Sequence, residues 1–476
     1  MNGLHESLSD SFQDGLLAEA DVSEELVQRA DALRKALNVP PGKVLHVVGL
    51  GAGAWGSVFI SMLQKQYRCL KDKVKFSIWR REGKKLNLQV AGQILESINR
   101  DSEVIRRLKH KGRYLKYVDA RLGDRTLSAD EVLTDGFCEN MLEMPLRPLT
   151  VVTDLFEAVW DADIIINSIP STDIRSVFGK IGNVVKERER IPIVVSLAKG
   201  VEFISKPNPH ILTPSGMIHE ASGIPRESIF YLGGPNIASE VWRGEYATAR
   251  ICGGEEAYRT PLAEFFRNSS FVVWDNPDIV NHEVMGGLKN VYAIGAGIIK
   301  AAAHNSATSM AVYFSNACAE MVFISHLITG VRDPVYLAGP LLADVYVTLL
   351  KGRNAWYGEQ LALGTIKVID GPYVPGKGLI QGISAVSNFH ELLSDERLNV
   401  PDPLTGEKVL PITLLPTLSA LQEVLTSAQK STRGHVANPG EYFLNRMKDD
   451  AATDPEKRLK ISTAVFIPNI TEALCH

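Results

Sequence analysis

The sequence predicts an α/β domain with a parallel sheet, followed by a mainly α-helical C-terminal domain. Short β-branched runs alternate with helical patterns as far as about residue 276, which is typical of a parallel sheet wrapped by helices. From about residue 277 the pattern changes to long apolar segments of helical length. At 476 residues the chain also exceeds the roughly 250 to 300 residues at which single cores stop growing, so at least two domains are expected.

The predicted elements divide the chain into three stretches. Residues 1–42 are charged and helical in pattern, and we expect a helical extension, an appendage or a dimer arm, that ends at a Pro-Pro-Gly breaker. Residues 43–276 are the predicted α/β domain, which a polar and partly helical insertion interrupts at about 82–150. Residues 277–476 are the predicted helical domain, which we expect to bind substrate and carry catalytic groups.

Composition and charge favour a soluble protein that acts on small molecules. Hydrophobic residues make up 45% and charged residues 22%, and the net charge of −4 offers no basic surplus for nucleic acid or an anionic membrane. The sequence contains no run of about 18 uninterrupted apolar residues, so we expect no membrane span. The five cysteines are scattered without metal-ligand spacing, and the N-terminus lacks a basic, apolar leader, so we expect a cytoplasmic protein without a metal site.

The segment HVVGLGAGAWGSVF, residues 46–59, places four glycines between a β-branched run and a helical pattern. It fits the fingerprint of a Rossmann-type dinucleotide-binding turn in two registers, which begin at Gly49 and at Gly51. Such a turn needs one glycine for the bend, one where the backbone meets the pyrophosphate, and one small residue where helix packs on strand. The alternative is a structural glycine-rich turn, which the alternating elements downstream make less favourable.

The end of the second predicted strand leaves the dinucleotide type open. An NAD site usually has Asp or Glu there, but FSIWRREG places Arg80 and Arg81 at this point. Two arginines either hold a 2′-phosphate, which would indicate NADP, or stack on adenine, which is compatible with NAD.

Two lysines stand where chemistry is possible. Lys289 and Asn290 lie inside the small, apolar helical pattern GGLKNVYAIGAG, and burial lowers the pKa of a lysine so that it can exchange a proton near neutral pH. Lys199 ends the predicted strand IPIVVSLAKG, where a doubly wound sheet opens onto its ligand crevice. The alternatives are a lysine that reaches solvent from a helix edge and a solvated turn lysine.

The segment DVYVTLLKGRN carries four further candidates: Asp344, Thr348, Arg353 and Asn354. An aspartate can orient a catalytic lysine, and Arg with Asn suits a grip on a phosphate. From spacing alone, these residues also fit an ordinary polar turn.

Taken together, six segments resemble NAD-dependent glycerol-3-phosphate dehydrogenase, particularly the plant and green-algal cytosolic type. The resemblance runs from NGLHESL at the N-terminus to about residue 392. Its most specific segments are GAGAWG, SLAKGVE, YLGGPNIASEV, HEVMGGLKNVYAIGAG, AGPLLADVYVTLLKGRNAWYG and GKGLIQG.

The resemblance implies interconversion of dihydroxyacetone phosphate and sn-glycerol 3-phosphate by hydride transfer with NAD(H). It implies that Lys289 donates and accepts the proton at the C2 oxygen, that Lys199 binds or polarises this oxygen, and that Asp344 and Thr348 line the site. Asn290 would lie beside the lysine, and Arg353 with Asn354 would bind the substrate phosphate. The cofactor-binding positions it implies, together with the two arginines above, are Gly51, Ala52, Gly53, Ala54, Trp55, Gly56, Arg80, Arg81, Pro170, Ser171, Ala238, Arg353 and Gln381.

The resemblance favours the register of Gly51, Gly53 and Gly56, leaves Gly49 as a strand-end residue, and fits a homodimer. Two other functions stay open at this point: a related dehydrogenase of another 2-hydroxy acid, and a dinucleotide-binding redox sensor without catalysis. Beyond residue 393 we place one element, a packing helix at ITLLPTLSALQEVL.

Overall fold

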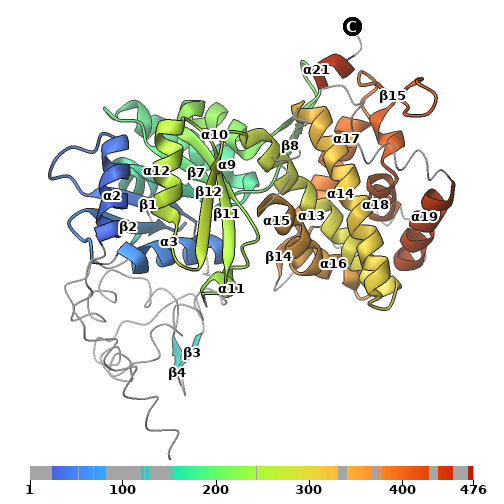
Figure 1. Cartoon of the computed structure of the whole chain (residues 1–476), viewed down its shortest axis with the longest axis horizontal. Helices are drawn as coiled ribbons and strands as arrows, with labels where there is room; N and C mark the ends of the chain where they lie inside the picture. The colour runs from blue at the N-terminus through green and yellow to red at the C-terminus, as the bar shows by residue number, and fades with distance from the viewer. Residues whose placement is uncertain are drawn as a thin grey trace, which may run out of the picture.

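Figure 1 shows the computed structural model of the chain. The structure describes residues 24–51, 53–67, 69–81, 120–122, 125–127, 150–152, 154–242, 244–330, 340–366, 372–374, 377–427, 438–453 and 470–474. Ala52, residues 1–23 and most of the predicted insertion lie outside these ranges.

Within the described residues, the N-terminal domain is built on one eight-stranded sheet with the order β12-β11-β10-β7-β6-β1-β2-β5. The six strands from β10 to β5 are parallel, as predicted, but β11 pairs antiparallel with β10 and parallel with β12. The last two strands therefore run against the other six. The strands are β1 (Leu45–Leu50), β2 (Val74–Trp79), β5 (Thr150–Val152), β6 (Ile164–Asn167), β7 (Ile193–Ser196), β10 (Ile229–Gly233), β11 (Ala247–Gly253) and β12 (Phe271–Asn276).

Helices cover both faces of this sheet, because neighbouring residues of each central strand point to opposite sides. Val47 packs with α2 (Glu24–Ala36), α3 (Ala54–Tyr67) and α12 (Glu256–Phe266), whereas Val48 packs with α8 (Leu155–Trp160), α9 (Ser171–Lys186) and α10 (Pro214–Ser222). The described part of the predicted N-terminal extension is thus a layer of this domain, since α2 buries Ala30 and Leu33 against it.

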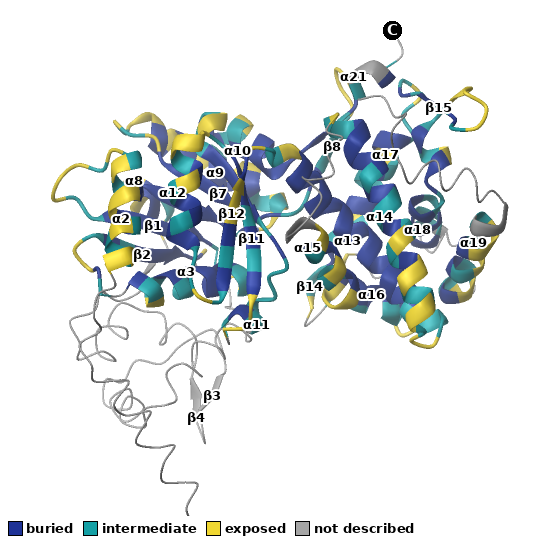
Figure 2. Ribbon diagram, viewed as in Figure 1, coloured by how far each residue is buried: buried dark blue, intermediate teal, exposed yellow. Residues whose placement is uncertain are grey.

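The C-terminal domain is a bundle around α13 (Ile279–Ala302), which contacts six other described helices of the bundle and is buried along most of its length (Figure 2). The crossing with α16 is close: a Cβ on Gly297 would lie 1.9 Å from the Ala355 carbonyl oxygen. The predicted packing helix is α18, whose leucines join the core. The other helices of the bundle are α14 (Ala307–Thr329), α15 (Pro340–Leu350), α16 (Arg353–Ala362), α17 (Gln381–Leu393), α18 (Pro416–Ser427), α19 (Pro439–Thr453) and α21 (Ile470–Ala473).

Shorter elements complete the described fold. They are β3 (Ala120–Leu122), β4 (Arg125–Leu127), β8 (Glu202–Ile204), β9 (His210–Leu212), η1 (Arg226–Ser228), α11 (Ala238–Trp242), β13 (Tyr373–Val374), β14 (Gly378–Leu379), β15 (Val400–Pro401), β16 (Lys408–Val409) and η4 (Pro411–Leu414). Among the described helices, only α14 is long and apolar enough to cross a membrane by length and composition, and half of its most apolar window is buried inside the bundle.

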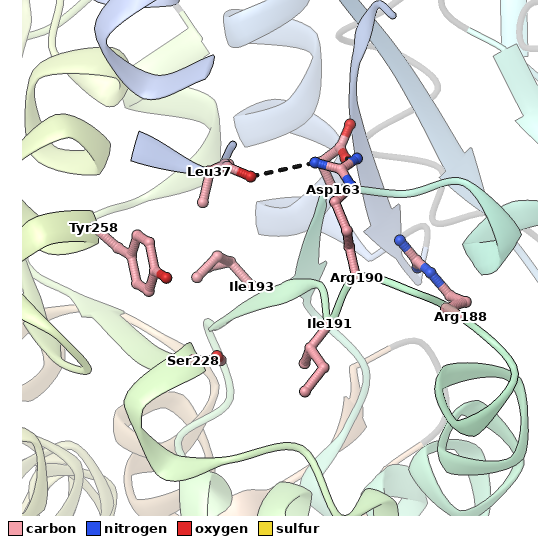
Figure 3. Close-up of a pocket in the computed structure, with 8 residues that line it drawn as sticks. All are labelled: Leu37, Asp163, Arg188, Arg190, Ile191, Ile193, Ser228 and Tyr258. Atoms are coloured by element: carbon pink, nitrogen blue, oxygen red, sulfur yellow. Dashed lines mark hydrogen bonds and ion pairs between the residues drawn. The ribbon is translucent and has the colours of Figure 1, made fainter. Parts of the chain in front are cut away.

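The amino end of the sheet holds a small cavity of about 50 Å³ (Figure 3). It lies at the opposite end of the strands from the glycine-rich turn. Its lining residues are Leu37, Asp163, Arg188, Arg190, Ile191, Ile193, Ser228 and Tyr258.

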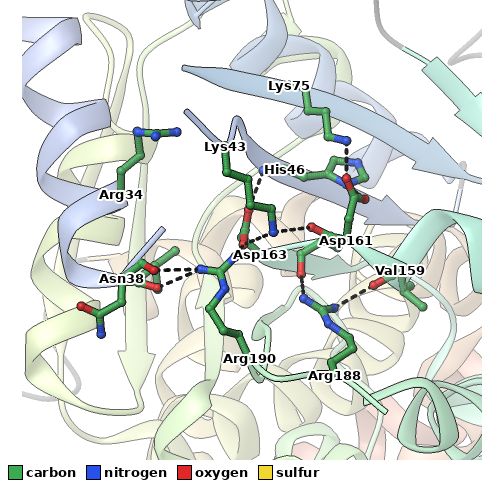
Figure 4. A network of polar contacts seen from close by, with 12 residues as sticks. Arg34, Asn38, Lys43, His46, Lys75, Val159, Asp161, Asp163, Arg188 and Arg190 are labelled. Atoms are coloured by element: carbon green, nitrogen blue, oxygen red, sulfur yellow. Dashed lines mark hydrogen bonds and ion pairs between the residues drawn. The ribbon is translucent and has the colours of Figure 1, made fainter. Parts of the chain in front are cut away.

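A network of ion pairs surrounds this cavity (Figure 4). Asp163 is paired with Arg190 and with Lys43, whose Nζ lies 3.3 Å away, and it accepts a 2.9 Å hydrogen bond from the His46 backbone. Arg190 also donates to two carbonyls at the end of α2, at Leu37 and Asn38. The network thus joins the N-terminal helix to β1 and to the start of β6.

Candidate active site

The glycine-rich turn between β1 and α3 has a geometry that is compatible with the register of Gly51, Gly53 and Gly56. Gly51 has φ +96°, where a side chain is strained, and it makes the bend. A Cβ on Gly53 would meet no described atom closer than 4.0 Å, whereas one on Gly56 would lie 2.0 Å from Ser168 Oγ. The first glycine turns the chain, the second leaves its side open, and the third lets the helix pack closely.

This geometry fits a dinucleotide. The open side of the turn lies at the N-terminus of α3, where free backbone N–H groups and the helix dipole favour a pyrophosphate. Gly49, in contrast, belongs to the strand, because a Cβ there would lie 2.7 Å from Ile60 Cγ1. The Trp55 ring packs on Phe59 and Phe271 in the aromatic core.

The other predicted cofactor positions lie at the start of helices or the end of strands on the same edge of the sheet. Pro170 caps α9 and Ser171 begins it, and Ala238 begins α11. Arg80 and Arg81 follow β2; Arg80 is buried, and Arg81 forms a 3.2 Å ion pair with Asp173. Ala52 lies outside the described residues.

Two lysines meet one carboxylate between the domains. Lys289 on α13 forms an ion pair with Asp344 Oδ2 on α15, and Lys199, which follows β7, places its Nζ 3.4 Å from the same oxygen. The side chains of Lys289, Asp344 and Lys199 are 2%, 5% and 23% exposed, so water reaches the cluster from the Lys199 side. Thr348, one turn after Asp344, donates a 2.7 Å hydrogen bond to its backbone carbonyl.

The pKa of Lys289 is lowered from its ordinary value. Burial is the largest cause, because it disfavours the charged ammonium, and the positive charge of Lys199 adds to it. The carboxylate of Asp344 opposes both effects but does not outweigh them. The cluster therefore contains a lysine that can exchange its proton.

Two glycines just before Lys289 bring its helix against the Lys199 segment. A Cβ on Gly287 would lie 3.0 Å from Val201 Cγ1 and 3.5 Å from the Lys199 carbonyl oxygen. A Cβ on Gly286 would lie 2.7 Å from the hydroxyl of Tyr231, a fully buried residue of β10. The paired glycines are thus the sequence signal for a close contact between α13 and the sheet.

A chain of side-chain amides joins three helices beside this cluster. Asn354 Nδ2 donates to Asn290 Oδ1 at 2.8 Å, and Asn354 Oδ1 accepts from the Gly382 backbone at 3.0 Å. Gln381 and Arg353 are the first residues of α17 and α16, and Arg353 is exposed, next to Gly378. The structure therefore places Asn290, Arg353, Asn354 and Gln381 together.

Three residues near the site escaped the sequence analysis. Tyr231 and Glu283 belong to apolar segments that predict only core, and Asn388 lies in the middle of α17, where its Nδ2 donates 2.7 Å to the Val201 carbonyl. The only signal for Glu283 is a charged residue within an apolar helical pattern, the same signal that identified Lys289.

An open glycine turn on one domain and a buried, titratable lysine on the other define a nicotinamide-dependent dehydrogenase with separate cofactor and catalytic domains. Family models described as NAD-dependent glycerol-3-phosphate dehydrogenase N-terminus and C-terminus match residues 140–258 and 278–408. The chain belongs to the NAD-dependent glycerol-3-phosphate dehydrogenase family.

Similar plant proteins cover most of the chain. A probable cytosolic glycerol-3-phosphate dehydrogenase [NAD(+)] of Oryza sativa is 52% identical over 435 residues, which are 91% of each chain. A cytosolic glycerol-3-phosphate dehydrogenase [NAD(+)] of Arabidopsis thaliana is 51% identical over 452 residues, 95% of this chain and 97% of that one.

Solved structures share the fold. The Dunaliella salina enzyme DsGPDH has a TM-score of 0.60 at 19% identity and covers 85% of this chain, which spans 60% of that longer chain. Glycerol-3-phosphate dehydrogenase of Plasmodium falciparum also has a TM-score of 0.60, at 18% identity, with 87% of this chain and 97% of that one covered.

Proposed function

We propose that Lys289, Lys199 and Asp344 carry the proton chemistry of an enzyme that interconverts dihydroxyacetone phosphate and sn-glycerol 3-phosphate with NAD(H). The observation that carries this proposal is the buried Lys289, held by Asp344 beside Lys199. A carbonyl reduction needs such a group, because the oxygen that gains negative charge must receive a proton.

NADH, when bound at the glycine turn, supplies the hydride to C2 of the ketone. The Lys289 ammonium donates its proton to the C2 oxygen and becomes a neutral amine, while Lys199 stabilises the negative charge that develops there. In the oxidation of the alcohol, the neutral amine accepts the hydroxyl proton. Asp344 contacts both lysines and holds them on one side of the substrate.

Arg353 and Asn354 would bind the substrate phosphate at the start of α16. Arg353 is exposed and can form two parallel hydrogen bonds with phosphate oxygens. Asn354 is held in place by its contacts with Asn290 and Gly382. Because the phosphate is the strongest handle on a three-carbon substrate, this grip aligns C2 with the lysines.

The cofactor is NAD, as the names of the plant relatives indicate. At the end of β2, the Arg81 guanidinium is already paired with Asp173, which reduces the positive charge available to a 2′-phosphate. The same relatives are named cytosolic, which confirms the prediction of a cytoplasmic protein.

Initial rates with dihydroxyacetone phosphate and either NADH or NADPH test substrate, reaction and cofactor together. We expect oxidation of NADH at a clearly higher kcat/KM than of NADPH. The matched control is unphosphorylated dihydroxyacetone with wild type and Arg353→Ala. The substitution should raise KM for dihydroxyacetone phosphate and leave the slow rate with dihydroxyacetone almost unchanged. Equal effects on the two substrates would contradict the proposed role of Arg353 in binding the phosphate.

The chain also fits a homodimer. Three apolar side chains of α15 are exposed: Leu342, Tyr346 and Leu350. These residues recur every four positions and so share one face of α15, and Phe314 of α14 adjoins this face, since its ring lies 5.8 Å from that of Tyr346. A second copy can cover this face.

Light scattering after size exclusion tests this second proposal. We expect about twice the chain mass of 52.2 kDa for the wild type and a monomer for Leu342→Glu with Leu350→Glu. Phe156→Glu, at an equally exposed residue of α8, is the control that should remain a dimer. A monomeric wild type would refute the proposal.

A further inference from the structure

Glu283 is a fully buried carboxylate that the proposed chemistry does not use. It lies on α13, six residues before Lys289, and is 0% exposed. Its two oxygens accept hydrogen bonds from the Ser215 backbone N–H at 2.8 Å and from Ser215 Oγ at 2.5 Å. Burial raises the pKa of Glu283 to about 7, against these hydrogen bonds, which lower it.

The contact joins the two segments that carry the catalytic lysines. Ser215 is the second residue of α10, which follows Lys199 after the short β8–β9 hairpin. Glu283 and Lys289 belong to one uninterrupted helix, about 9 Å apart along its axis at 1.5 Å per residue. A shift at Glu283 is therefore transmitted to Lys289 by a rigid element.

Two other contacts hold the same segment. Gly287 brings α13 against the backbone of Lys199, and Asn388 of α17 donates to the carbonyl of Val201. The stretch after β7 is thus fixed to the helical domain on both sides, and Glu283 supplies the carboxyl contact of this set.

We propose that Glu283 is a positioning residue, whose carboxyl group on the N-terminus of α10 sets the placement of Lys289 against Lys199 and Asp344. This inference rests on the proposed roles of the two lysines. A buried carboxylate costs free energy in desolvation, which here is offset by two donors and by the positive end of a nine-residue helix. Loss of the group lets α13 shift, and a misplacement of about 1 Å can cost on the order of 10²-fold in rate.

The chain offers a matched control in Glu320 of α14. It is also 0% exposed and also bonds a helix N-terminus, since it accepts from the backbone of Thr417 at 2.8 Å and of Leu418 at 3.1 Å, at the start of α18. Glu320 also accepts from the Tyr292 hydroxyl of α13 at 3.0 Å. All three partners lie within the helical domain, so none of these contacts reaches the Lys199 segment.

The experiment compares Glu283→Ala with Glu320→Ala by thermal unfolding and by kcat and KM for each substrate. We expect both to lower Tm, but only Glu283→Ala to lower kcat, by about 10- to 100-fold with KM for NADH nearly unchanged. Glu283→Gln keeps an acceptor for the Ser215 amide and should restore most of the lost rate.

If Glu283→Ala does not fold, Ser215→Ala tests the positioning role of Glu283, because it removes only the hydroxyl donor to this carboxyl group. We expect a smaller fall in kcat, and a Glu283→Gln/Ser215→Ala double variant whose loss is less than the product of the single losses. Wild-type kcat in Ser215→Ala, or equal kcat losses in Glu283→Ala and Glu320→Ala, would overturn the inference. Lys289→Ala separates the two proposals, because turnover retained in that variant would refute the proposed chemistry itself.

Discussion

Two regions of this molecule each hold a buried aspartate between two cations, and they differ in whether one of the cations is buried as well. At the amino end of the sheet, Asp163 lies between Lys43 and Arg190, whose side chains are 32% and 27% exposed. Between the domains, Asp344 lies between Lys199, 23% exposed, and Lys289, 2% exposed.

This difference shows that an ion pair alone does not make a side chain able to exchange its proton. Lys43 and Arg190 keep contact with water, so their charges cost little free energy in desolvation. Lys289 has lost water, and its pKa falls even beside a carboxylate. One cluster fastens strands and a helix together, and the other holds a lysine that can give up its proton.

The largest expected effect comes from substituting one lysine in each cluster. Lys289→Ala should lower kcat by about 10³-fold, within the range for loss of a general acid, while NADH binding stays nearly intact. Lys43→Ala should leave kcat unchanged. Steady-state rates and a titration of NADH fluorescence measure both quantities, and a Lys289→Ala variant with near wild-type kcat would end the proposed mechanism.

Substitution of the two aspartates should affect different properties, stability for Asp163 and activity for Asp344. Asp163→Asn removes the charge that pairs with Lys43 and Arg190 and weakens the acceptor for the His46 backbone, and it should lower the free energy of unfolding by about 2 kcal/mol, with kcat unchanged. Asp344→Asn should lower kcat by about 10-fold or more, because both lysines lose their common partner. Urea unfolding and steady-state rates give the two measurements. A fall in kcat for Asp163→Asn would show that the amino-end network affects the active site.

The sequence predicted the parts of the site that follow local rules. The glycine turn follows from the need for residues without Cβ, Lys199 from the end of a strand, and Lys289 from a charge in an apolar helix. The α/β domain and the helical bundle follow from hydrophobic periodicity, and the structure and the family models confirm both.

The remainder depends on contacts between distant segments. Glu283 meets Ser215 across 68 positions of the chain, and hydrophobic periodicity carries no information on such a partner. Nor could the direction of β11 and β12 be predicted, because a strand has the same period of two whichever way it runs. Tyr231 was missed for a similar reason, since its segment predicts only a buried strand.

The pH dependence of the rate tests whether the lowered pKa of Lys289 controls the proton transfer. Since its pKa is lowered and reduction needs the protonated amine, kcat for reduction should fall with rising pH well below the ordinary lysine pKa of about 10.4, and kcat for oxidation should rise over the same range. Asp344→Asn removes the charge that raises this pKa and should move the inflection to lower pH. Lys199→Ala removes a charge that lowers it and should move the inflection to higher pH. Shifts of the same sign in both variants would contradict this account.

The smallest expected effect concerns stability. Because the pKa of Lys289 is lower in the folded state, the unfolded chain binds more protons between the folded and unfolded pKa values, and stability rises with pH across that window. The destabilisation by Lys289 is therefore complete below its folded pKa and is lost above the unfolded pKa of about 10.4. Lys289→Met, with Asp344 still paired to Lys199, should raise Tm by a few degrees at neutral pH or below, and the gain should shrink toward pH 10. Lys43→Met should lower Tm slightly, because it removes one of the two cations paired with Asp163. If the gain in Tm for Lys289→Met does not vary with pH, the gain comes from packing and not from removal of the buried charge. The distinction between the two clusters would then rest on the kinetic measurements alone.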